Sequence, residues 1–278
     1  MAKESRVPLR KFIQSGRASL VADIIGYGDP IIFLHAAVAD KRMWRAQMRS
    51  VGKNNKAIAY DRRGFGETLY EEEEFSSVVD LLAVIKTIAK DRPPILVGSS
   101  QGGRIAIDAA LLHPSSIRGL VLIAPNIAGT LKVPNSIKIR HLLEQQKVAT
   151  EAGNIDDVNS IKARLWLDGP LAPKGRVVGQ ARQLLFDMNT IILRSPATGR
   201  DVDITSVSPV FQRLKEITMP SLIIWGDLDF PHIQDRCRLA ASKIANGSSH
   251  KLVGTGHLPS LDQPQEISRL IKDFATCC

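Results

Sequence analysis

The sequence predicts an α/β protein in which a mostly parallel sheet lies between layers of helices. Short apolar runs, typical of buried strands, alternate with segments whose apolar residues recur every three or four positions, as on one face of a helix. This alternation stops over residues 128–214, where the patterns are helical or irregular, and then resumes. Because alternating strands and helices favour a parallel sheet, we predict one sheet interrupted by a helical insertion.

Eight segments carry the strand pattern. They are residues 11–14, 19–25, 30–35, 57–61, 95–97, 120–125, 221–225 and 250–253. The first two are close enough to pair as a hairpin, whereas helix-length segments separate most of the others. The insertion therefore follows the sixth of eight strands.

Five segments between these strands carry the helix pattern. They are residues 42–51, 75–90, 104–110, 234–244 and 265–274. In the second of them Val78, Leu81 and Ile85 share one helix face. We predict that residues 1–127 and 215–278 form the core and that residues 128–214 form a helical cap.

The composition is that of an ordinary globular protein, with 44% hydrophobic and 23% charged residues among 278. The net charge is +9, but the basic residues are scattered, which argues against a nucleic-acid partner. No apolar run is long enough for a membrane span, and the first residues lack the apolar core of a secretory signal. The three cysteines, two of them adjacent, favour a reducing cytoplasm. The oligomeric state cannot be read from the sequence.

Residues 94–103 carry the strongest functional signal. An apolar strand breaks into Gly98-Ser99-Ser100-Gln101-Gly102, and a helix pattern follows at once. A serine at such a strand-to-helix turn has a strained backbone and an exposed hydroxyl, which identifies Ser100 as a candidate nucleophile. The N–H of Gln101 then begins the helix, where it can donate to an oxyanion.

The same residues allow two other interpretations. One is an ordinary Gly/Ser turn between a strand and a helix. The other is a phosphate loop, because Gly98 and Gly103 have the spacing of Gly-x-x-x-x-Gly-Lys-Ser/Thr. Arg104 and Ile105 replace the lysine and the Mg²⁺-binding hydroxyl of that motif, which argues against a nucleotide site.

A nucleophilic serine needs a base and an acid that orients the base. His257 lies in a glycine-loosened loop just after the last predicted strand, and it is our candidate base. Asp229 follows the seventh strand and is the candidate acid, whereas Asp227 is expected to cap the turn. The loop after the third strand should supply a second oxyanion donor, either the N–H of Ala37 or that of Ala36.

With Ser100, Asp229 and His257 in this order, the chain resembles the α/β-hydrolase superfamily from about residue 21 to residue 274. Residues 60–66, Tyr-Asp-Arg-Arg-Gly-Phe-Gly, look like the Asp-x-Arg-Gly-x-Gly turn of that superfamily. Residues 41–44 and the general layout are similar to the branch of 3-oxoadipate enol-lactonases and small esterases. One departure is Ala36, where relatives usually have glycine after the strand-end histidine.

The resemblance implies an α/β-hydrolase fold and a serine hydrolase that cleaves a small carboxylic ester or lactone through an acyl-enzyme, without metal or organic cofactor. Thioesters, C–C bonds and perhydrolysis use the same triad, and a non-catalytic or very slow ligand-binding protein remains the alternative from another class. Trp44, Trp166 and Met188 are candidates to line an apolar substrate pocket, although packing between cap and core would use the same residues.

Overall fold

The computed structural model describes residues 7–90, 92–130, 133–202 and 209–278. A continuous sheet of eight strands runs in the order β1-β2-β4-β3-β6-β7-β8-β9, and the two-residue β5 pairs with β2 at its side. The strands are β1 Leu9–Ser15, β2 Ala18–Ile25, β3 Pro30–Leu34, β4 Lys56–Tyr60, β5 Leu69–Tyr70, β6 Ile95–Ser99, β7 Gly119–Ile123, β8 Ser221–Gly226 and β9 Gly247–Leu252.

The sheet is mostly parallel, as the sequence predicts. The hairpin β1–β2 is antiparallel and β2 is antiparallel to β4, whereas every pair from β4 to β9 along the sheet is parallel. The expected strands are all found, with boundaries that differ by a few residues. Because parallel strands end at the same edge, the loops after β3, β6, β8 and β9 gather there.

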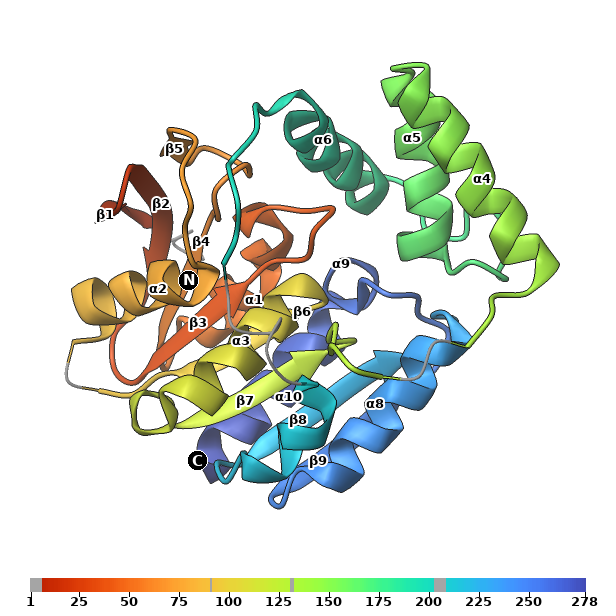
Figure 1. Cartoon of the computed structure of the whole chain (residues 1–278). Helices are drawn as coiled ribbons and strands as arrows, with labels where there is room; N and C mark the ends of the chain where they lie inside the picture. The colour runs from red at the N-terminus through yellow and green to blue at the C-terminus, as the bar shows by residue number, and fades with distance from the viewer. Residues whose placement is uncertain (1–6, 91, 131–132, 203–208) are drawn as a thin grey trace, which may run out of the picture.

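Helices cover both faces of this sheet (Figure 1). The helices are α1 Arg45–Val51, α2 Ser77–Val84, α3 Gln101–Leu112, α4 Ile137–Glu151, α5 Ile155–Lys162, α6 Gln180–Arg194, α7 Val210–Arg213, α8 Pro231–Lys243, α9 Pro259–Asp262 and α10 Pro264–Cys277. Short 3-10 or π turns are η1 Lys41–Trp44, η2 Ile85–Ala89, η3 Pro114–Ser116, η4 Ala163–Asp168 and η6 Leu214–Glu216.

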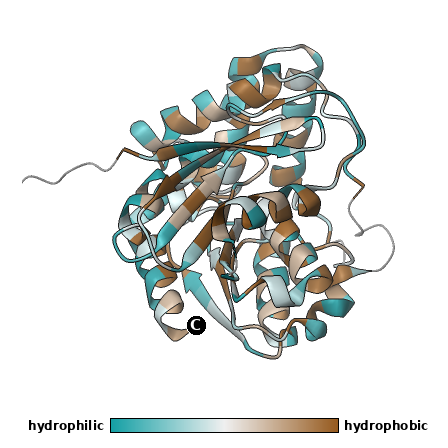
Figure 2. Ribbon diagram, turned by 90° about the vertical axis from the view of Figure 1, so that its left-hand side faces the viewer, coloured by the Kyte–Doolittle hydropathy of each residue, from teal (hydrophilic) through white to brown (hydrophobic). Residues whose placement is uncertain are grey.

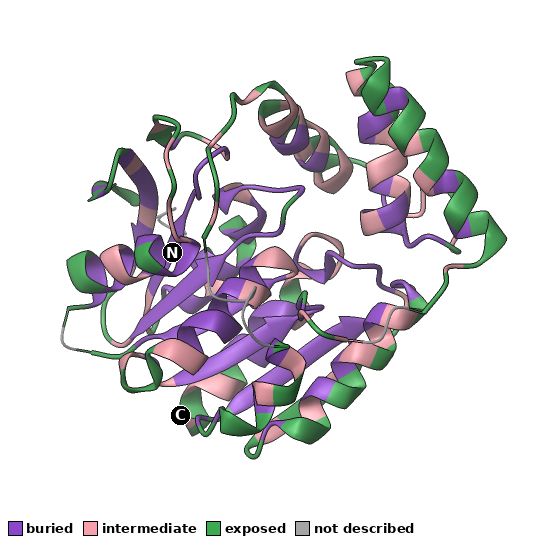
Figure 3. Cartoon of the chain, in the orientation of Figure 1, coloured by how far each residue is buried: buried purple, intermediate pink, exposed green. Residues whose placement is uncertain are grey.

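Two apolar layers hold the helices on the sheet. On β6, the side chain of Leu96 packs in the layer that includes Ile105 of α3, whereas Val97 packs in the layer that includes Met48 of α1 and Ile271 of α10. Successive residues of a strand point to opposite faces, so an uninterrupted apolar strand contributes to both layers. Figure 2 shows the inner strands of the sheet as largely hydrophobic, and Figure 3 shows them as buried.

The helices α4, α5 and α6 form the insertion between β7, the sixth long strand, and β8. Figure 1 shows them together, above the sheet. The outer side of α4 is exposed, whereas Ile139 and Leu142 on the same helix are buried (Figure 3). The limits of the cap at residues 128 and 214 stay a prediction. In the described part of the chain, no helix is long and apolar enough to cross a membrane.

Candidate active site

The turn between β6 and α3 has the geometry that the sequence predicts. Ser100 has φ 52° and ψ −111°, a backbone conformation that residues other than glycine rarely adopt. A Cβ on Gly98 would lie 2.5 Å from the carbonyl oxygen of Gly102, and a Cβ on Gly102 would lie 2.3 Å from that of Leu34. The two glycines are therefore required because backbone approaches them too closely for a side chain.

Ser100 also precedes the first turn of α3. The N–H groups in that turn have no carbonyl one turn earlier, so they remain available to a ligand. The N–H of Gln101 is the first of them. The partial positive charge at this helix end adds to its ability to stabilise an oxyanion.

Asp229 and His257 form a buried pair. The Oδ2 atom of Asp229 lies 2.6 Å from Nδ1 of His257, and its Oδ1 atom accepts a hydrogen bond from the N–H of Phe230 at 2.7 Å. Each residue exposes only 2% of its surface. Since a carboxylate accepts, Nδ1 of His257 carries the proton, and the lone pair of Nε2 is left to accept another.

Asp227 has a different partner. Its Oδ1 atom accepts a hydrogen bond from the N–H of Gly254 at 2.7 Å, which joins the loop after β8 to the loop after β9. The structure therefore places Asp229, and not Asp227, against the histidine.

Ser100, Gln101, Ala37 and His257 line one cavity of about 220 Å³. Its other lining residues are Ala36, Val38, Arg104, Asn126 and Trp166. The structure thus brings together the residues expected as nucleophile, base and oxyanion donors, while Asp229 lies behind the base. Ile105, at the position of the phosphate-loop hydroxyl, is buried in the core.

The three residues expected to contact substrate are separated. Trp166 lines the cavity; its ring centroid is 4.8 Å from that of His257, and its carbonyl accepts the N–H of His257. Trp44 is fully buried against Phe33, with ring centroids 5.3 Å apart. Met188 is also buried, and its sulfur accepts the N–H of Asp40. Trp44 and Met188 are not among the residues that line this cavity, and their role in substrate binding stays a prediction.

Sequence reasoning missed three residues of the cavity, namely Val38, Arg104 and Asn126. Asn126 follows β7, and its N–H donates to the carbonyl of Ser100 at 2.9 Å. Arg104 lies one helical turn after Ser100 and pairs with Asp201 at 3.2 Å. The position of Asn126 after a strand end and that of Arg104 one turn along α3 are signals that could have identified these two residues.

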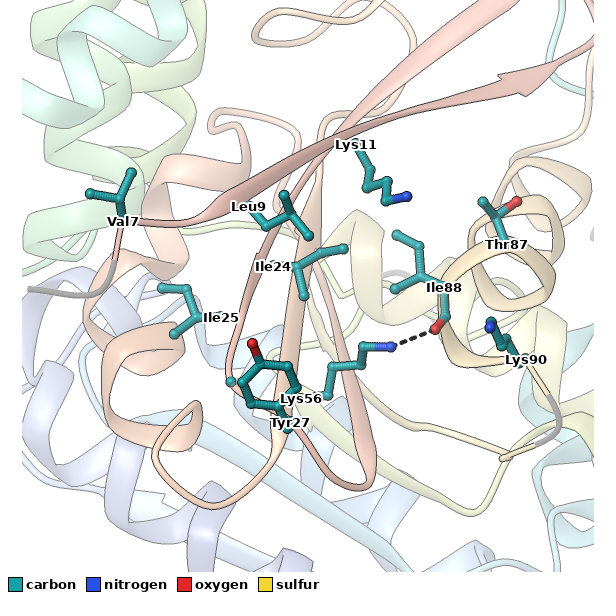
Figure 4. A pocket seen from close by; sticks show the side chains of 11 residues that line it. Val7, Leu9, Lys11, Ile24, Ile25, Tyr27, Lys56, Thr87, Ile88 and Lys90 are labelled. Carbon is teal, nitrogen blue, oxygen red and sulfur yellow. Dashed lines mark hydrogen bonds between the residues drawn. The ribbon is translucent and has the colours of Figure 1, made fainter.

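A larger cavity of about 640 Å³ lies away from Ser100 and shares no lining residue with the first (Figure 4). It lies between the hairpin β1–β2 and η2, with Leu9 and Ile24 on one side and Lys11, Lys56 and Lys90 around them. The ammonium group of Lys56 donates to the carbonyl of Ile88 at 2.9 Å. The larger cavity contains none of the candidate catalytic groups, so the smaller one is the candidate active site.

The fold is that of an α/β hydrolase, and comparison with known proteins gives the same class. The chain matches the Alpha/beta hydrolase family over residues 31–270, so it belongs to that family.

The chain is similar to two curated proteins, one named as an esterase and the other as a biotin biosynthesis protein. The chain is 23% identical over 272 residues to a pimeloyl-acyl-carrier-protein methyl ester esterase of Nitrosospira multiformis, covering 94% of this chain and 99% of the relative. It is 27% identical over 266 residues to the biotin biosynthesis bifunctional protein BioHC of Teredinibacter turnerae; that match covers 88% of this chain but only 44% of the relative.

Among solved structures, a thermophilic esterase of Thermogutta terrifontis superposes with a TM-score of 0.76. The match covers 97% of this chain and 98% of that one, at 18% identity. It confirms the predicted α/β-hydrolase fold. The protein is accordingly an α/β hydrolase with esterase-like relatives.

Proposed function

We propose that the protein is a serine hydrolase that cleaves a small carboxylic ester or lactone through an acyl-enzyme. The observation that carries this proposal is the buried Asp229–His257 pair beside the cavity that Ser100 also lines. A buried carboxylate that fixes the tautomer of a histidine next to a strained serine serves to activate that serine.

The proposed reaction has two halves. Ser100 Oγ attacks the carbonyl carbon while Nε2 of His257 takes its proton, and the N–H groups of Gln101 and Ala37 stabilise the oxyanion. The intermediate then collapses, His257 protonates the leaving alkoxide, and the acyl group remains on Ser100. Water, deprotonated by His257, releases the acid and restores the serine. Each oxyanion donor contributes about 3 kcal/mol to such steps in related chemistry.

The cavity supports a small acyl group. Its volume of about 220 Å³ lies below the usual range for drug-sized ligands, and Val38, Trp166 and the two alanines give it largely apolar walls. A lactone is an internal ester, so it passes through the same intermediate. We further propose that residues 128–214 cover this site, because η4 of the insertion supplies Trp166.

A cytoplasmic location is part of the same proposal. It rests on the cysteine pattern: Cys237 is a buried free thiol, and Cys277 and Cys278 are adjacent free thiols at the end of α10.

Hydrolysis of p-nitrophenyl acetate and butyrate tests the proposal. Ser100→Ala and His257→Ala should each lower kcat by about three orders of magnitude or more. Ser99→Ala is the matched control: it removes a neighbouring hydroxyl that is buried and has no hydrogen-bond partner among the described residues, and it should keep the wild-type rate. A wild type no faster than Ser100→Ala on either ester would favour the ligand-binding alternative.

A further inference from the structure

The turn after β4 contains two adjacent arginines, Arg62 and Arg63, and only one of them has a purely structural environment. The guanidinium of Arg63 donates to Asp80 at 2.9 Å, to Glu73 and to the carbonyl of Ser15 at 2.7 Å. It therefore joins this turn to α2 and β1. In the Asp-x-Arg-Gly-x-Gly pattern, Arg63 occupies the arginine position and Arg62 the variable one.

Arg62 is turned toward the loop after β3. Its side chain is buried and donates to the carbonyl oxygens of His35, at 3.2 Å, and Ala36, at 3.5 Å. Its guanidinium carbon lies 4.4 Å from the ring centroid of Phe65. The nearby carboxylate of Asp61 is paired with Lys41 at 2.6 Å. Both hydrogen bonds come from one nitrogen of Arg62, Nη2, which also lies 3.2 Å from Nδ1 of His35. Arg62 thus directs Nη2 to backbone carbonyls of one loop.

The histidine at the start of that loop adds a second contact. The backbone N–H of Arg62 donates to Nε2 of His35 at 3.1 Å, so Nε2 is an acceptor and Nδ1 carries the proton. Nδ1 then donates to the carbonyl of Ala36 at 2.9 Å. Burial first, and the charge of Arg62 second, lower the pKa of His35 well below its usual value, which keeps this ring neutral.

The carbonyl of Ala36 is therefore held from several sides: by the His35 ring, by Arg62, and by the N–H of Ala39 at 3.3 Å. This carbonyl shares a planar trans peptide unit with the N–H of Ala37, and in such a unit the two groups point in opposite directions. Fixing the oxygen on one side therefore aims the N–H of Ala37 to the other side. Ala37 lines the cavity with Ser100 and Gln101.

The neighbouring N–H is already used. The N–H of Ala36 donates to the sulfur of Met43 at 3.4 Å, which leaves Ala37 of the two donors expected from the sequence. We propose that Arg62 is a positioning residue that, together with His35, fixes the Ala36–Ala37 peptide so that its N–H completes the oxyanion hole. The inference rests on the proposed serine hydrolase function.

The test compares Arg62→Met and Arg62→Lys with the wild type. The measurements are kcat and KM on p-nitrophenyl butyrate, the inhibition constant of butylboronic acid, and the urea midpoint. Butylboronic acid forms a tetrahedral adduct with a reactive serine, so its affinity reports the oxyanion site. Arg63→Lys is the matched control, since it changes the adjacent buried arginine, which does not contact this loop.

We expect Arg62→Met to lower kcat by about 10- to 100-fold with KM nearly unchanged, because one oxyanion donor is misaligned rather than removed. The inhibition constant of butylboronic acid should rise by a similar factor. Arg62→Lys should recover part of both losses, since lysine keeps the charge but is shorter and lacks the planar guanidinium that places Nη2 beside both carbonyls. Arg63→Lys should leave kcat and the inhibition constant at their wild-type values.

Three results would overturn the inference: a folded Arg62→Met enzyme with wild-type kcat, a rise in KM alone, or a loss of kcat without weaker boronic acid binding. If Arg62→Met does not fold, Arg62→Lys against Arg63→Lys decides in the same way. If the wild type has no esterase activity, or if Ser100→Ala does not lower it, the proposed function itself is contradicted.

Discussion

Nδ1 of His257 lies 2.6 Å from Oδ2 of Asp229, and both side chains are buried at the edge of the sheet where the parallel strands end. Burial removes the competing water, and the second oxygen of the carboxylate is held by the N–H of Phe230. The imidazole is therefore fixed in position and in tautomer before any substrate arrives.

This relationship predicts different effects for two neighbouring aspartates. Asp229→Asn presents an amide to His257 and favours the wrong tautomer, so kcat should fall by about three to four orders of magnitude. Asp227→Asn retains a carbonyl oxygen that can accept from Gly254, so kcat should stay within about threefold of the wild type. Steady-state kinetics of both variants provide the check, and equal losses would rule out the assignment of the acid.

The backbone of Ser100 predicts a change in stability. At φ 52° and ψ −111° a residue with a Cβ is strained by about 1–2 kcal/mol, whereas glycine is not. Glycine also loses more conformational entropy on folding, by about 0.5–1 kcal/mol. Ser100→Gly should therefore be more stable than Ser100→Ala by up to about 1.5 kcal/mol in urea unfolding.

The neighbouring serine is the control for that comparison. Ser99 lies in β6 and does not have a positive φ, so Ser99→Gly should be less stable than Ser99→Ala. If the glycine variant is less stable than the alanine variant at both positions, the backbone at Ser100 is unstrained.

His35 predicts a dependence of stability on pH. The pKa of His35 in the folded protein is lowered, mainly by burial and next by the charge of Arg62, so the unfolded chain binds a proton at a higher pH than the folded chain does. Its stabilising contribution is complete above about pH 6.5 and is lost as the pH falls below that value, by up to about 1.4 kcal/mol per pH unit.

Urea unfolding of the wild type and His35→Gln between pH 7 and pH 5 measures this contribution. The variant should lose stability less steeply on acidification. His232, whose pKa is lowered first by burial and next by Arg236, contributes in the same direction and remains in the variant. An equally steep loss in His35→Gln would show that His35 takes up its proton in the folded state.

Most of the fold could be predicted from the sequence because strands and helices in this chain have distinct apolar patterns. Residues 95–97 are apolar without interruption, as a strand covered on both faces requires, and the glycines around Ser100 follow from the close approach of the backbone. The position of His257 after the last strand was sufficient to propose it as the base.

The substrate cavity could not be predicted in the same way. Trp44, Trp166 and Met188 are all large and apolar, and only their three-dimensional positions separate a cavity wall from the core. The contact between Arg62 and the loop of Ala36 was equally invisible, since it joins the loops that follow two neighbouring strands of the sheet, β4 and β3. The assignment of catalytic roles to Ser100, Asp229 and His257 stays a prediction.

Labelling with a fluorophosphonate, followed by mass spectrometry of the intact protein and its peptides, tests the activation of Ser100 most directly. We predict one adduct per chain, located on the peptide that contains Ser100, absent from Ser100→Ala and much slower to form in His257→Ala. Wild-type protein that stays unlabelled, or that carries the adduct on another residue, would contradict the proposed serine hydrolase.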